Sequence, residues 1–142
     1  MHPASLPLQK LTDAEKHLVS SDVPENEALS RFFLIWTIKE AYTKAIGLGL
    51  GFDLRRIECN IPTNTVMVDG VLATQWQFES CRVTVEEDVY QITVAQFVGT
   101  GKGTVISLAQ GQIVRSDASC FVRKAVRQLK GLELDETVNS DY

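Results

Sequence analysis

The chain has 142 residues, a formal net charge of −4, a hydrophobic share of 44% and a charged share of 23%. These values are typical of a soluble globular domain and exclude fibrous and disordered chains. Acidic and basic residues are interleaved without a Lys/Arg block, which argues against nucleic acid as a ligand. No segment approaches the ~20 apolar residues of a membrane span. The three cysteines are odd in number and favour reduced thiols, so we expect a cytoplasmic protein without a membrane anchor.

Two helices are predicted in the first third of the chain. Residues 11–19 form the first, because Thr12 and Glu15 have the Thr-x-x-Glu spacing of a capping box. Residues 20–26 break the pattern. Residues 27–46 then form one long helix, free of proline and closed by Gly47.

After the long helix the apolar period changes from 3.6 to two, which predicts antiparallel strands. The Asp69-Gly70 pair predicts a type I' hairpin turn, because both central residues of that turn need a positive φ. The acidic run at residues 86–88 predicts a solvated turn, with a metal site as the less favoured interpretation. The four predicted strand segments are residues 54–61, 66–72, 75–85 and 89–98.

The last third of the chain has weaker patterns. A hairpin is predicted at residues 104–114 around Gln110-Gly111, and a helix at residues 117–130 has one apolar face. We therefore expect an α+β fold in which a long helix packs on an antiparallel sheet. The expected organisation is a domain at residues 1–100 and an extension with one helix at residues 101–142.

The long helix carries a polar stripe opposite an apolar face. At 100° per residue, Thr37, Glu40, Lys44 and Gly47 lie within about 40° of the direction of Phe33. Glu40 and Lys44 have two interpretations: an ordinary i,i+4 ion pair, or a Mg²⁺ ligand beside a lysine that contacts phosphate. The apolar face is expected to be core and comprises Leu34, Ile35, Ile38, Ala41, Tyr42, Ala45 and Ile46.

The glycines at residues 47–51 are not interpreted as a nucleotide loop. Phosphate-binding glycines precede a helix, where free N–H groups and the positive end of the dipole face the anion. These glycines follow a helix, so we expect a C-cap and a tight turn.

Residues 36–50, WTIKEAYTKAIGLGL, closely resemble the W-x-x-KE-[AS]-x-x-K-x-x-G-x-G motif of Sfp-type 4'-phosphopantetheinyl transferases. The match combines a tryptophan, a Lys-Glu pair, a second lysine and a Gly-x-Gly in order. The resemblance covers residues 11–98 and identifies the chain as the carboxyl-terminal half of such an enzyme, one half of the family's pseudo-dimer.

The resemblance implies an activity and a set of site residues. Such enzymes transfer the phosphopantetheine arm from coenzyme A to a serine of an apo carrier protein and release adenosine 3',5'-bisphosphate. By resemblance, Glu40 is the Mg²⁺ ligand and helps catalysis, Lys44 is catalytic and contacts phosphate, and Lys39 also contacts phosphate. A metal and cations suit phosphoryl transfer because they offset charge on the transferring group.

The sequence departs from the family pattern at its start. The Gly-x-Asp motif that supplies further metal carboxylates does not occur before Leu11. We therefore expect a missing amino-terminal half, or self-association through an exposed apolar surface. The alternative function is an inactive or complementation-dependent half that acts as a binding module.

Overall fold

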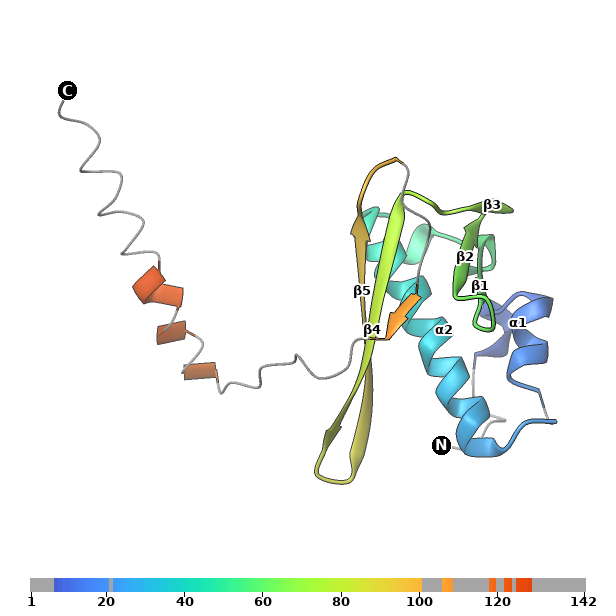
Figure 1. Ribbon diagram of the computed structural model, residues 1–142, viewed down its shortest axis with the longest axis horizontal. Helices are drawn as coiled ribbons and strands as arrows, with labels where there is room; N and C mark the ends of the chain where they lie inside the picture. The colour runs from blue at the N-terminus through green and yellow to red at the C-terminus, as the bar shows by residue number, and fades with distance from the viewer. Residues whose placement is uncertain are drawn as a thin grey trace. The chain divides into compact units, whose positions relative to one another are not determined.

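A computed structural model describes residues 7–20, 22–100, 106–108, 118–119, 122–123 and 125–128 (Figure 1). Contacts divide the chain into two units, Met1–Gln110 and Gly111–Tyr142, and each is described by itself. The elements in chain order are η2 (Leu8–Lys10), α1 (Asp13–Leu18), α2 (Glu25–Ala45), η3 (Gly49–Gly51), η4 (Leu54–Arg56), β1 (Ile57–Asn60), β2 (Thr65–Val68), β3 (Val71–Leu72), β4 (Trp76–Val85), β5 (Asp88–Phe97) and β6 (Ile106–Leu108).

Both predicted helices of the first unit are confirmed. The capping box of α1 is complete: the Thr12 hydroxyl accepts from the Glu15 N–H at 3.3 Å, and Glu15 Oε2 accepts from the Thr12 N–H at 2.8 Å. The long helix α2 begins after Pro24, two residues earlier than predicted. Proline suits this place because the first helical turn leaves N–H groups unpaired.

The strands form two sheets, and their registers confirm the hairpin turns predicted at residues 69–70 and 86–88. The first sheet has the order β1-β2-β3 and the second the order β5-β4-β6. Val68 pairs with Val71 across a two-residue turn in which Asp69 and Gly70 have φ of 52° and 75°, as a type I' turn requires. The β4–β5 hairpin is ten residues long on each side.

Two details differ from the prediction. Residues 54–56 form the 3-10 turn η4 rather than strand, because the Asp53 carboxylate accepts from the Arg55 N–H at 3.0 Å and caps that turn. The second sheet is not wholly antiparallel, because β6 pairs in parallel with β4 through Phe78 and Ile106. The α+β class is therefore correct, and the sheet content is mixed.

The hydrophobic core lies where α2 meets both sheets. Figure 1 shows α2 alongside the β4–β5 hairpin, with β1, β2 and α1 near its other side. The predicted apolar face is core at Leu34, Ile35 and Ile38, but Ala45 is exposed because α2 ends there. The buried core cluster comprises Leu11, Phe32, Leu34, Ile35, Ile38, Phe52, Leu54, Ile57, Cys59, Val66, Phe78 and Ile106.

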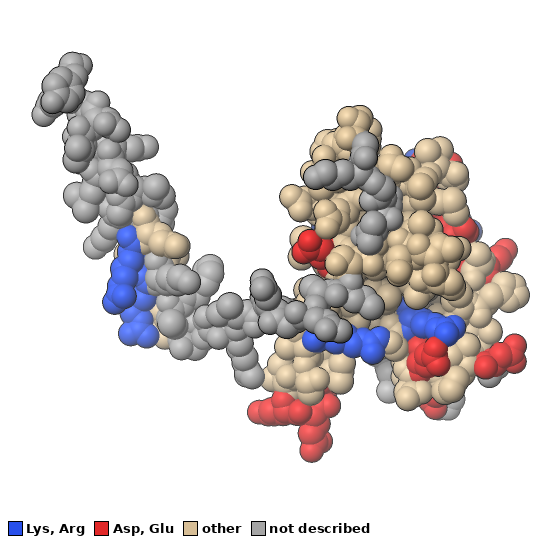
Figure 2. Space-filling model, viewed as in Figure 1, with Lys and Arg blue, Asp and Glu red and all other residues tan. Residues whose placement is uncertain are grey.

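The free end of the β4–β5 hairpin is acidic, and Figure 2 shows its carboxylates gathered at the tip. Glu86 has a φ of 57° and lies in the turn between Val85 and Asp88, which confirms the predicted turn. Among the described residues, no group of three or more His, Cys, Asp or Glu is arranged to hold a metal ion.

The second unit is helical at residues 118–119, 122–123 and 125–128, within the predicted helix at 117–130. The remaining residues of that helix, and the predicted hairpin turn at Gln110-Gly111, lie outside the described residues. Across the described part of the chain, no helix is both long enough and apolar enough to cross a membrane.

Candidate active site

A cavity of about 230 Å³ opens beside the carboxyl-terminal half of α2. Glu40 and Lys44 both line it, so the structure brings these two predicted site residues together. The walls come from four parts of the chain: the end of η2, the last turns of α2, the glycine-rich turn and η4. The lining residues are Lys10, Trp36, Glu40, Thr43, Lys44, Gly49, Leu50, Phe52 and Leu54.

Glu40 and Lys44 lie one helical turn apart on the polar stripe of α2. Lys44 Nζ is 3.9 Å from Glu40 Oε2, and the two side chains are 77% and 32% exposed. At this separation and exposure the attraction contributes little to stability. Both groups therefore remain available to a ligand, the carboxylate for a cation and the ammonium for an anion.

The glycine-rich turn ends α2 and leads into the cavity wall. Gly47 has a φ of 74°, the Gly47 N–H donates to the Lys44 carbonyl at 3.1 Å, and the Leu48 N–H donates to the Thr43 carbonyl at 3.2 Å. This pair of bonds is the Schellman motif of a helix C-terminus. The predicted C-cap is confirmed at Gly47, and the free N–H groups of α2 lie at its other end.

The structure places Lys39 away from Glu40 and Lys44. Its side chain is 0% exposed and forms a buried ion pair with Glu15, with Nζ 2.6 Å from Oε2. The sequence contains one signal for this burial. Lys39 lies on the same helical stripe as three apolar or small residues, Phe32, Ile35 and Thr43. Lys39 is thus a core residue of α2 and does not line the cavity.

Lys10 lines the cavity, although no sequence pattern indicated it. It lies at the end of η2, in a segment that has no motif of its own, and long-range contacts bring it to α2. With Lys44 it gives the described lining of the cavity two ammonium groups against one carboxylate.

Phe52 forms an apolar wall and is held by neighbouring side chains. The Arg56 guanidinium lies 4.6 Å above its ring centroid, and Arg56 in turn donates two hydrogen bonds to Asp69, at 2.7 and 2.6 Å. The bond from Arg56 lowers the pKa of Asp69. The Tyr42 ring meets Phe52 edge-on, and desolvation, with the Asp69 charge, raises the pKa of Tyr42.

The donor set of the cavity fits a diphosphate and one divalent cation. Mg²⁺ commonly takes one or two carboxylates and completes its shell with substrate phosphates and water. Glu40 is the only carboxylate in the described lining. Lys10 and Lys44 supply positive charge for phosphate oxygens. Glu40 can hold the cation only together with ligands from a substrate or another chain.

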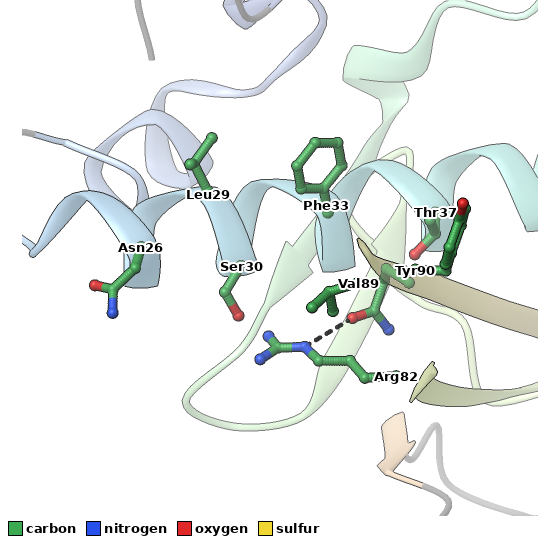
Figure 3. A pocket seen from close by; sticks show the side chains of 9 residues that line it. Asn26, Leu29, Ser30, Phe33, Thr37, Arg82, Val89 and Tyr90 are labelled. Carbon is green, nitrogen blue, oxygen red and sulfur yellow. Dashed lines mark hydrogen bonds between the residues drawn. The ribbon is translucent and has the colours of Figure 1, made fainter. Parts of the chain in front are cut away.

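A second cavity, of about 570 Å³, lies between the first half of α2 and the β4–β5 hairpin. Figure 3 shows it between Leu29, Phe33 and the strand residues Val89 and Tyr90, with Arg82 donating to Gln91 at 3.2 Å. Its described lining contains no carboxylate and shares no residue with the Glu40 cavity.

Comparison with known proteins relates this chain to one protein family. The family model "4'-phosphopantetheinyl transferase superfamily" matches residues 2–95. The chain is 44% identical over 120 residues to the 4'-phosphopantetheinyl transferase pptA of Paxillus involutus, a match that covers 84% of this chain and 46% of that protein.

Two further relatives have similar names. The human L-aminoadipate-semialdehyde dehydrogenase-phosphopantetheinyl transferase is 33% identical, over 53% of this chain and 28% of that protein. The phosphopantetheinyl transferase of Thraustochytrium sp. is 37% identical, over 47% of this chain and 24% of that protein. This chain therefore spans less than half the length of each of these relatives. On the family-model match, which includes the motif of α2, the chain belongs to the 4'-phosphopantetheinyl transferase superfamily.

Proposed function

We propose that this chain carries the catalytic helix of an enzyme that transfers the 4'-phosphopantetheine arm of coenzyme A to a serine of an apo carrier protein. One observation carries the proposal: Glu40, Lys44 and Lys10 line a single cavity, whose described lining has one carboxylate and two ammonium groups. The family supports the same reaction, because its relatives are named as phosphopantetheinyl transferases.

The reaction is a phosphoryl transfer between two oxygen atoms. The serine oxygen forms a new bond to the phosphorus that carries the pantetheine arm, and the bond from that phosphorus to the bridging pyrophosphate oxygen breaks. The serine proton is lost, and adenosine 3',5'-bisphosphate leaves. Charge grows on the leaving oxygen, so catalysis depends on groups that position and neutralise it.

The proposed roles follow from the exposure of each group. Glu40 holds Mg²⁺, which supplies charge neutralisation across the pyrophosphate when it is bound. Lys44, the most exposed of the three predicted site residues, reaches the leaving phosphate and stabilises its charge. Lys10 faces the same cavity and binds a second phosphate group.

The full site is proposed to need a second half. This chain covers 46% of the Paxillus relative, and its described residues give the cavity one carboxylate. The missing carboxylates then come from an amino-terminal half or from a second copy of this chain. The enzyme is proposed to work in the cytosol, where the free thiols Cys59 and Cys81 stay reduced.

Mass spectrometry of an apo carrier protein tests this proposal. The carrier is incubated with the chain, coenzyme A and Mg²⁺, with and without the amino-terminal half of a relative. We expect a mass gain of one phosphopantetheine arm. Glu40→Ala should lower the rate by about 100-fold or more, because a group that offsets developing charge is lost.

Glu27→Ala is the matched control. Glu27 lies on the same helix and forms an exposed i,i+4 pair with Arg31, but it does not line the cavity. It should leave the rate unchanged. No mass gain with several carriers, with a folded chain and the added half present, would overturn the proposed function. A gain only with the added half would identify this chain as a complementation-dependent half.

A further inference from the structure

The buried ammonium of Lys39 joins three separate segments to α2. Its Nζ atom lies 2.6 Å from Glu15 Oε2, 2.9 Å from the Leu54 carbonyl oxygen and 3.2 Å from the Lys10 carbonyl oxygen. A lysine ammonium has three N–H donors, so all of them are used. The side chain is 0% exposed, and no donor remains for a ligand.

Two of these three acceptors belong to walls of the Glu40 cavity. Lys10 and Leu54 both line it, and each lies in a 3-10 turn of three residues. Such turns have few hydrogen bonds of their own. Lys39 is next to Glu40 in the sequence, so its ammonium fixes both walls relative to the helix that carries Glu40 and Lys44.

Glu15 makes the burial of this charge possible. Its Oε1 accepts from the Cys59 N–H at 2.8 Å, and its Oε2 accepts from the Thr12 N–H at 2.8 Å and from Lys39. The pair is thus neutral and fully hydrogen-bonded. Apolar residues of similar volume commonly replace such a pair without loss of stability, so stability alone does not account for it.

We propose that Lys39 is a positioning residue of the active site, which holds the Lys10 and Leu54 walls at the distance from Glu40 that coenzyme A requires. The inference rests on the proposed function for its ligand. It assigns to Lys39 a structural task in place of a contact with phosphate.

The test compares the wild-type chain with Lys39→Met in a Glu15→Gln background. Lys39→Met alone leaves an unpaired buried carboxylate and can prevent folding, and the second substitution removes that charge. Glu15→Gln alone is the control for the second substitution: it keeps the carbonyl acceptors of Lys39 in both walls but leaves the buried ammonium without its carboxylate, so its folding needs the same check. Circular dichroism establishes that each variant is folded.

Amide hydrogen exchange measures, without any ligand, how firmly the Lys10 and Leu54 walls are held. The Ile57 N–H donates to the same Leu54 carbonyl that Lys39 contacts, and the Leu11 N–H donates to Leu8 within the turn that ends at Lys10. In the double variant both amides should exchange faster than in Glu15→Gln, while amides of the β4–β5 hairpin should not change.

Steady-state kinetics of the chain together with the added amino-terminal half measure the effect on KM for coenzyme A. Displaced walls should raise KM for coenzyme A on the order of tenfold. A merely structural role lowers the folded fraction, which lowers the apparent kcat and leaves KM unchanged. Thr93→Val is the stability control, because it removes a part-buried hydrogen bond to Ser80 and neither residue lines the cavity.

Faster exchange together with a raised KM supports the proposal. Unchanged exchange in the folded double variant, or faster exchange with an unchanged KM, overturns it. If the wild-type enzyme shows no transfer at all, the proposed function fails instead, and the exchange measurement alone decides whether Lys39 holds the walls.

Discussion

The Thr93 hydroxyl in β5 lies 2.8 Å from the Thr37 hydroxyl in α2, and this hydrogen bond joins the β4–β5 hairpin to the candidate catalytic helix. Thr37 also donates to the Leu34 carbonyl at 3.1 Å. Because a hydroxyl has one proton, Thr93 must then donate to Thr37, and Ser80 must donate to Thr93 at 2.7 Å. The three hydroxyls form one directed chain from sheet to helix.

Thr93→Val should destabilise the fold by about 1–3 kcal/mol, because it leaves the Ser80 hydroxyl, at 0% exposure, without its acceptor. Urea denaturation measures the change. Thr84→Val is the matched control, since Thr84 is exposed on the same hairpin and the same substitution there should cost less than about 0.5 kcal/mol. Equal costs at both positions would contradict the hydroxyl chain.

Lys44→Ala should lower the transfer rate about 100-fold and change the free energy of unfolding by less than about 0.5 kcal/mol. The reason is that its side chain is 77% exposed and its ammonium comes no closer than 3.9 Å to the Glu40 carboxylate, so it contributes little to the fold. Lys44→Arg keeps the charge and should retain part of the rate. Steady-state kinetics and thermal melting are the two measurements.

Lys16→Ala controls for the loss of an exposed lysine. Lys16 pairs with Asp13 on α1 at 2.8 Å and does not line the cavity, so its removal should leave the rate unchanged. If the transfer rate of Lys44→Ala equalled that of Lys16→Ala, Glu40 and Lys44 would form only an ordinary i,i+4 helix pair with no catalytic role.

The sequence predicted those parts of the fold that local rules decide. The Thr12–Glu15 capping box, the Gly47 C-cap and the Asp69-Gly70 turn were all found as expected, because each depends on residues within a few positions of one another. The exposed stripe of α2 followed from helical geometry and placed Glu40 and Lys44 together.

The parts that the sequence did not predict depend on long-range contacts. Lysine is a residue type that usually lies at the surface, and only the pairing of Lys39 with Glu15, 24 residues away, explains its burial. Lys10 reaches the cavity through its contact with α2, and β6 pairs in parallel with β4, although β5 lies between them in the sequence. No short pattern specifies any of these contacts.

The Asp53 carboxylate should titrate near pH 2 in the folded chain. Its pKa is lowered from 3.8 to about 2 by side-chain and backbone hydrogen bonds from Arg55. A carboxyl whose pKa is lower in the folded state stabilises the fold above its unfolded pKa. The contribution to folding is therefore complete above about pH 4 and disappears as the pH falls from 3.8 towards 2.

Carbon NMR of the Asp53 carboxyl measures this midpoint directly. Arg55→Ala removes the side-chain bonds from Nε and Nη2 but keeps the bond from the Arg55 N–H, so the midpoint should rise only part of the way to 3.8. Because Asp53 caps η4, which carries the cavity residue Leu54, protonation should also lower the protection of the Arg55 amide against exchange, relative to an unstructured amide at the same pH. A wild-type midpoint near 3.8 would show that the hydrogen bonds from Arg55 do not hold the Asp53 carboxylate in its capping position.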